Sequence, residues 1–116
     1  LPDIVKGLRR LADSDSAWLR EAAANVEAGC PVSAHLIHRL LREARTFSLK
    51  QALMRELKVA LQCCRHPDFV EGVRALLVDK DGQPSWTYPD VASVEPSFID
   101  ELLAPAWDTN PLADLK

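Results

Sequence analysis

The segment SLKQALMRELKVALQCCR, residues 48–65, is the clearest helix in the sequence. Its first four residues fit a capping box, in which the Ser48 hydroxyl accepts from the Gln51 amide and the Gln51 side chain reaches back. Apolar residues recur at helical spacing on one side, and polar residues recur at steps of three and four on the other. Because Ala52 and Val59 widen the apolar side, we expect this helix to lie at the centre of the domain.

The other predicted elements are also helices, which gives an all-α class: a small bundle of about five or six helices. Their expected ranges are 3–11, 16–28, 34–45, 68–78 and 96–103. Gly29 is expected to end the second helix in a left-handed conformation, and Ser33 to cap the third. Asp68 is expected to cap the fifth, with Glu71 completing a second capping box.

The predicted fifth helix should pack against the rest of the bundle through its apolar residues, Phe69, Val73, Leu76 and Leu77. Gly72 within it costs up to about 1 kcal/mol relative to alanine, so some close backbone contact should compensate. An extended polar and aromatic segment follows, with Trp86, Tyr88 and Pro89. We assign residues 1–104 to the helical domain and 105–116 to a tail that Trp107 and Leu112 could anchor.

Size and charge exclude several classes of protein. The chain has 116 residues, enough for one domain, with 14 basic and 17 acidic side chains and a formal charge of −3. This balance argues against a basic nucleic-acid-binding module. No run approaches the roughly 18 apolar residues of a membrane span. We therefore expect no nucleic-acid and no membrane partner.

The sequence opens at Leu1, and its only methionine is Met54. We interpret the chain as a piece of a longer protein, with processing as the alternative. Its three cysteines include the adjacent Cys63 and Cys64, between which a disulfide would be strained. We expect them to be reduced, as in a cytosolic protein, and to serve packing.

Few residues form a recognisable chemical site. His35 and His38 have a spacing that suits a metal, but no third ligand stands nearby, so no metal is expected. Glu56 lies beside the apolar side of its helix. It is expected to pair with an arginine such as Arg74, with a functional carboxylate as the alternative.

A basic stripe lies on the polar side of the same helix. It consists of Arg55, Lys58 and Arg65. Such a stripe is usually the solvated face of a helix. Contact with phosphates is the alternative.

One stretch of the sequence points to a more specific function than these patterns do. Residues 68–86 read DFVEGVRALLVDKDGQPSW. They resemble the C-terminal signature of 3-hydroxyisobutyryl-CoA hydrolases, a family of the enoyl-CoA hydratase/isomerase (crotonase) superfamily. The shared features are the Asp-Phe pair, the Glu-Gly-Val-Arg-Ala run, Asp-Lys-Asp, and a proline shortly before a tryptophan. Upstream, Glu56-Leu57-Lys58 departs from the glutamate-tyrosine-arginine that the family often has.

The resemblance implies that this is the C-terminal helical domain of an acyl-CoA enzyme, which closes over an N-terminal crotonase core and makes subunit contacts. The parent would hydrolyse a CoA thioester in valine breakdown. The oxyanion-hole amides and catalytic carboxylates of the family belong to that core. We therefore expect no catalytic residue, no bound cofactor and no turnover in this chain. Of the family's functional residues, the resemblance implies only Lys80, as a cation that faces CoA.

The resemblance also implies partners and a location. The expected partners are the crotonase core, the acyl-CoA substrate of the parent and a second copy in a homo-oligomer. The expected location is cytoplasmic, or the mitochondrial matrix if the source is eukaryotic. Two alternatives stay open: the parent is an enoyl-CoA hydratase or isomerase, or the chain is a freestanding helical interaction module.

Overall fold

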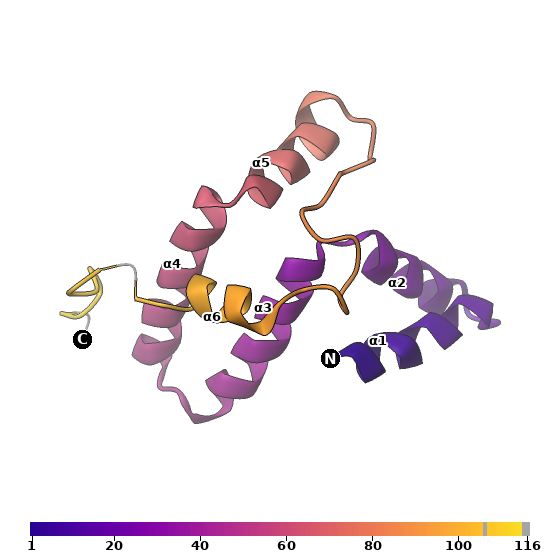
Figure 1. Cartoon of the computed structure of the whole chain (residues 1–116). Helices are drawn as coiled ribbons and strands as arrows, with labels where there is room; N and C mark the ends of the chain where they lie inside the picture. The colour runs from indigo at the N-terminus through magenta and orange to yellow at the C-terminus, as the bar shows by residue number, and fades with distance from the viewer. Residues whose placement is uncertain (106, 115–116) are drawn as a thin grey trace.

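Helices and turns, without a strand, make up the residues that the computed structural model describes, 1–105 and 107–114. The α-helices are α1 (Pro2–Arg9), α2 (Ala17–Ala28), α3 (Pro31–Glu43), α4 (Leu49–Arg65), α5 (Pro67–Val73) and α6 (Pro96–Leu102). Three short helical turns continue some of them, namely η1 (Arg10–Asp13), η2 (Ala44–Thr46) and the π-helical η3 (Arg74–Val78). The predicted all-α class is therefore confirmed (Figure 1).

The capping box predicted for α4 is present. The Gln51 backbone N–H donates to the Ser48 hydroxyl at 3.3 Å, and the Ser48 backbone N–H donates to the Gln51 side-chain oxygen at 2.7 Å. These bonds use backbone donors that have no partner inside the helix. The start of α4, the longest helix, is thus fixed by its own sequence.

Two other predicted caps are wrong for the same reason. Helix α3 begins at Pro31 with Cys30 as its N-cap, so Ser33 lies inside the helix and does not cap it. Helix α5 begins at Pro67, which makes Asp68 its second residue. Proline is favoured at the first helical position, because its fixed φ suits the helix and its missing N–H is not needed there.

The second helix ends where the sequence predicted. Gly29 follows the last residue of α2, but its φ of −70° and ψ of 160° are extended. The expectation of a left-handed glycine is therefore wrong. A Cβ on Gly29 would lie 3.0 Å from the carbonyl oxygen of Asn25, so the small residue is needed for space.

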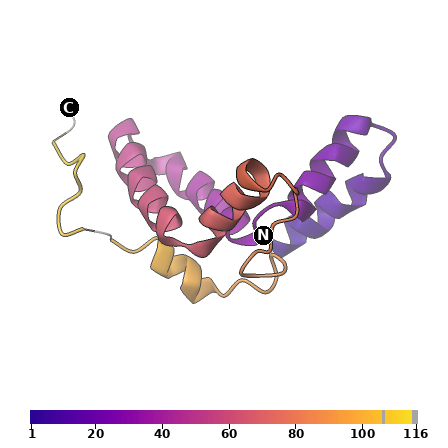
Figure 2. The same cartoon turned by 90° about the horizontal axis from the view of Figure 1, so that it is seen from above.

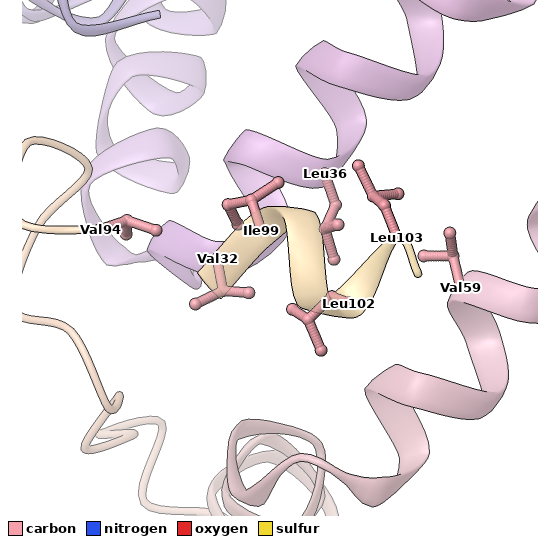
Figure 3. Packing of buried hydrophobic residues seen from close by; sticks show 7 residues of the cluster. All are labelled: Val32, Leu36, Val59, Val94, Ile99, Leu102 and Leu103. Carbon is pink, nitrogen blue, oxygen red and sulfur yellow. The ribbon is translucent and has the colours of Figure 1, made fainter. Parts of the chain in front are cut away.

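The core is formed where α6 crosses α3 and α4 (Figure 3). Ile99, Leu102 and Leu103 are each at most 8% exposed and project from α6 and its end. They pack with Val32 and Leu36 of α3, Val59 of α4, and Val94. Cys63, Tyr88 and Phe98 pack around this cluster, which agrees with a packing role for Cys63.

The first two helices form a hairpin beside this core (Figures 1 and 2). Val5 of α1 and Ala23 of α2 are buried, and the Arg9 guanidinium pairs with Glu27 across the hairpin. Trp18 is 72% exposed, so the hairpin leaves a large aromatic side chain in water. In the described part of the chain, no helix has the length and apolar character needed to cross a membrane.

The C-terminal segment lies along α4. The Asn110 side-chain amide donates to the Met54 carbonyl at 2.9 Å, and the Lys50 ammonium donates to the Ala113 carbonyl at 2.6 Å. Trp107 and Leu112 are half-buried. Of the tail predicted for 105–116, residues 106, 115 and 116 lie outside the described residues.

Loss of the α4 cap should weaken the whole domain. Ser48→Ala removes one side of the capping box and is expected to lower the free energy of unfolding by about 1 kcal/mol. Urea denaturation followed by circular dichroism measures this change. Ser16→Ala is the matched control, because Ser16 is the N-cap of α2 and makes no side-chain capping bond. Equal losses in both variants would contradict a specific role for Ser48.

Candidate functional site

The best candidate site is built around α5. Three side chains hold this helix in place, and we call them its fixed points; the first is Asp68. This side chain is 7% exposed. Its Oδ1 accepts hydrogen bonds from the backbone N–H and the hydroxyl of Thr87, both at 2.8 Å, and its Oδ2 accepts from the Cys30 thiol at 3.3 Å. A buried carboxylate needs such donors. Asp68 therefore ties α5 to the loop at Thr87 and to the start of α3.

His66, and not Asp68, caps α5. The His66 Nδ1 accepts the backbone N–H of Asp68 at 3.2 Å, and the His66 ring packs edge-on against Phe98 with ring centroids 5.0 Å apart. The predicted capping box of Asp68 and Glu71 is therefore wrong. Glu71 has different partners, Arg74 and Ser85.

Arg74 is the second fixed point. Its guanidinium donates to both Glu71 carboxylate oxygens, at 2.8 and 2.9 Å, and further to Asp79, Asp81 and the Gln83 carbonyl. Glu71 also accepts the backbone N–H of Ser85 at 2.7 Å. The hydrogen bonds from Arg74 and then Ser85 lower the pKa of Glu71 to about 2. Residues 79–85 are therefore held against α5 by charge-assisted hydrogen bonds.

Trp86 is the third fixed point. A Cβ built on Gly72 would lie 3.3 Å from the end of the Trp86 indole, so the ring packs against the glycine. The indole N–H donates to the Ala28 carbonyl at 3.0 Å. The close contact predicted at the Gly72 backbone is present, and its partner is a side chain of the extended segment and not another stretch of backbone.

These elements line an apolar cavity of about 500 Å³ that is open to solvent. Its wall combines the start of α3, the end of α4, α5 with η3, and the loop that carries Trp86. The polar residues that line it include His66 and Asp68, and most others are apolar, such as Val32, Leu36 and Phe69. A cavity of this size and character is typical of a binding site.

Helix α5 and η3 carry what we call the α5–η3 apolar surface, and four of its six members also line the cavity. It consists of Phe69, Val70, Val73, Leu76, Leu77 and Val78, which are 36–71% exposed. The sequence predicted Phe69, Val73, Leu76 and Leu77 as a buried face, and this prediction is wrong. Helix α5 continues away from the α6 core, and only Ala75 of η3 is buried.

Lys80 follows η3, and its side chain is exposed. Its φ of 56° is left-handed, which is uncommon for a residue with a side chain. The neighbouring Asp79 and Asp81 carboxylates both accept from Arg74. The backbone on either side of Lys80 is therefore fixed. Its role toward CoA stays a prediction.

The other candidate residues serve the fold. Glu56 is exposed, and Arg74 binds Glu71, Asp79 and Asp81 instead, so the predicted pair of Glu56 and Arg74 is wrong. The His35 Nε2 lies 2.8 Å from the Val91 carbonyl. Among the described residues, no three His, Cys, Asp or Glu side chains are placed to hold a metal.

The three cysteines are thiols. Burial raises the pKa of Cys30 and of Cys63, which keeps both groups protonated at neutral pH. Cys64 is exposed. Sequence reasoning missed the bond from Cys30 to Asp68, because nothing in the sequence pairs positions 38 residues apart.

A family model described as enoyl-CoA hydratase/isomerase matches residues 1–103. The chain belongs to the enoyl-CoA hydratase/isomerase family. The match runs from α1 to the end of α6 and includes all three fixed points around α5. The family predicted from the resemblance of residues 68–86 is thus confirmed.

Named relatives of this family member include the mitochondrial 3-hydroxyisobutyryl-CoA hydrolase of Danio rerio, 33% identical over 99 residues. They also include the mitochondrial 3-hydroxyisobutyryl-CoA hydrolase-like protein 1 (34% over 101 residues) and small ribosomal subunit protein mS47 (31% over 98 residues), both of Arabidopsis thaliana. The alignments cover 82–85% of this chain and 24–25% of these relatives. The chain thus spans about a quarter of their length.

Arg74 pairs with Glu71, Asp79 and Asp81, and we call this group the Arg74 cluster. It should make the free energy of unfolding fall in acid. Because the pKa of Glu71 is lowered to about 2, its stabilising effect is complete above the ordinary glutamate pKa of about 4.3 and is lost as the pH falls toward 2. We expect the free energy of unfolding to decrease across this range, with a smaller decrease in Glu71→Gln.

Carboxyl ¹³C NMR titration and urea unfolding at each pH measure the effect. Glu21→Gln is the control, because it removes an exposed carboxylate of α2 without changing the Arg74 cluster. A Glu71 carboxyl signal that titrates near pH 4 would contradict the ion pair.

Proposed function

We propose that this chain is the C-terminal helical region of an acyl-CoA enzyme of the 3-hydroxyisobutyryl-CoA hydrolase type. The whole enzyme would hydrolyse the CoA thioester in valine breakdown, and this region alone would have no turnover. The observation that carries the proposal is the α5–η3 apolar surface on a chain that spans a quarter of its relatives. The remaining part of such an enzyme would supply the cover for this surface.

The exposed side chains support this role in binding the crotonase core. Five of the six members of the α5–η3 apolar surface are more than half exposed. Contiguous apolar patches of this kind usually mark an interaction surface. The segment is also rigidly positioned, since Asp68, Arg74 and Trp86 hold it at three points. A preorganised apolar surface loses less conformational entropy on docking.

The chemistry of the described residues supports a role in binding over one in catalysis. A cysteine nucleophile must be a thiolate, whereas burial raises the pKa of Cys30 and Cys63. The Asp68 oxygens already accept hydrogen bonds from Thr87 and Cys30. From the resemblance we assign to Lys80, in the whole enzyme, the role of a cation facing CoA. Its exposed side chain is compatible with this role.

The relatives also bear on where the protein works. Several are named mitochondrial, which favours the matrix for a eukaryotic source; a cytoplasmic location is proposed for a bacterial one. Relative mS47, named as a ribosomal protein, favours a second candidate function. In that candidate the chain acts as an interaction module, with the α5–η3 apolar surface binding a different protein.

The first experiment tests the activity. The whole enzyme is expected to hydrolyse 3-hydroxyisobutyryl-CoA, and the 116-residue chain is expected to give no thioester cleavage above the uncatalysed rate. Release of the CoA thiol measures both. Hydration of crotonyl-CoA in place of hydrolysis would identify the parent as a hydratase. Steady cleavage by the purified chain would overturn its assignment as a noncatalytic region.

The role of Lys80 is tested in the whole enzyme. Lys80→Gln should raise KM for the acyl-CoA by about 2- to 5-fold with kcat unchanged, because an exposed ion pair contributes up to about 1 kcal/mol. The matched control is Lys6→Gln, in which an exposed lysine of α1 is changed. An unchanged KM in Lys80→Gln would remove Lys80 from the CoA site.

The apolar surface is tested by sedimentation of the isolated chain. We expect self-association, which Leu76→Gln with Leu77→Gln should reduce without lowering the free energy of unfolding by more than about 0.5 kcal/mol. Ile37→Gln with Leu41→Gln is the control, because both residues are exposed on α3. A monomer at high concentration, or equal effects of the two double variants, would contradict this surface as the contact.

A further inference from the structure

The cavity lined by α5 and its neighbours joins the core to the protein surface. Val32 and Leu36 of its lining are each 4% exposed and belong to the core. Phe69 and Leu76 of the same lining are more than half exposed. The cavity therefore has buried apolar groups on its inner side and an open side that a small molecule can enter. Its volume of about 500 Å³ lies within the range of small-molecule sites.

The charges of the lining favour an uncharged ligand. Among the described residues that line the cavity, none is a lysine or an arginine, and the carboxylate is that of Asp68. An anion would meet this negative charge without a cation to offset it. The Asp68 oxygens already accept from Thr87 and from the Cys30 thiol, and its side chain is 7% exposed, so it offers little surface to a cation.

His66 adds a hydrogen-bond donor to this apolar lining. Its Nδ1 accepts the backbone N–H of Asp68 at 3.2 Å, so the neutral ring carries its proton on Nε2. The Asp68 Oδ2 lies 3.6 Å from Nδ1, which is too far for a hydrogen bond.

The Nε2–H of His66 is unpartnered and reachable. Within the described part of the chain it has no acceptor, yet the side-chain polar atom that is both buried and unpartnered there is the Arg55 Nε. The His66 Nε2 therefore keeps surface that a ligand can contact, although the side chain as a whole is only 11% exposed. A donor in such a place gains from an acceptor that the protein itself does not supply.

The lining is also fixed before a ligand binds. The bond to Asp68 and the edge-on contact with Phe98, whose ring centroid is 5.0 Å away, hold the His66 ring. Trp86, which also lines the cavity, packs against Gly72 and donates to the Ala28 carbonyl. A ligand would therefore find both side chains already ordered, which reduces the entropy lost on binding.

We infer that this cavity binds an uncharged, largely apolar small molecule that carries a carbonyl group, with the His66 Nε2–H donating to the carbonyl oxygen. The apolar body of the ligand would replace water against Val32, Leu36 and Phe69. The carbonyl group would satisfy the unpartnered donor. This inference goes beyond the proposed function, because it holds whichever reaction the parent enzyme catalyses.

The first experiment tests the class of ligand. Propiophenone, an uncharged aromatic ketone, is titrated into the ¹⁵N-labelled chain at a concentration where sedimentation shows a monomer. The ring nitrogens of the three histidines are followed by NMR. We expect a saturable shift of the His66 Nε2 signal. The anion 3-phenylpropanoate, which is similar in size, should bind at least about 10-fold more weakly, because its charge has no partner in the lining.

The second experiment tests the donor with a matched pair of variants. His66→Asn keeps an acceptor for the α5 cap, since asparagine is a favoured N-cap residue, but removes the ring donor. It should weaken propiophenone binding by about 3- to 10-fold, as expected for one neutral hydrogen bond. His38→Asn should leave the affinity unchanged, because His38 does not line the cavity. Calorimetry measures both affinities, after circular dichroism has established that both variants fold.

A third variant tests the location independently of the α5 cap. Ser33 lines the cavity and is exposed on α3, so Ser33→Leu should fill part of the space and weaken binding. An unchanged affinity in Ser33→Leu, equal affinities of the two histidine variants, equal binding of the ketone and the anion, or a His66 signal that never saturates would each overturn the inference. None of these outcomes depends on whether the whole enzyme hydrolyses acyl-CoA.

Discussion

The arrangement depends on one short helix, α6, that lies across two long ones. Helices α3 and α4 diverge from the turn at η2, and α6 packs on both of them (Figure 1). Ile99, Leu102 and Leu103 supply the buried surface that joins them (Figure 3). Burial of apolar area is the main stabilising term in such a small domain. Without α6, helices α3 and α4 would be joined only by the chain between them and by contacts of a few side chains.

Beyond this core, polar interactions hold α5 and η3 in place. Asp68 and Arg74 hold α5 and η3 through hydrogen bonds to residues 79–87, and Trp86 packs against Gly72. Because these bonds use side chains on one flank of α5, the other flank can stay apolar and exposed without loss of order. A segment outside the core thus keeps a defined shape. This division explains how one helix can be well fixed while its apolar side chains stay exposed.

Local signals in the sequence predicted local structure well. Ser48 and Gln51 are close enough in sequence to specify the α4 cap, and the helices near residues 16–28 and 96–103 follow from spacing alone. Burial could not be predicted in the same way, because amphipathic spacing in α5 shows only that one side is apolar. Whether that side faces the core depends on where α6 packs, which is a long-range property. The pairs of Asp68 with Thr87 and of Arg55 with Glu43 were missed for the same reason.

The π-helical turn η3 sets the direction in which the chain leaves α5. The Asp79 backbone N–H bonds to the Arg74 carbonyl five residues back, at 2.8 Å, where an α-helix would use four. The wider turn accommodates one extra residue and rotates the next part of the chain by about 100° relative to a regular helix. Lys80 follows this wider turn, and its own φ of 56° further sets the direction of the chain. A relative with one residue fewer here could keep the same lysine in sequence and still aim it elsewhere.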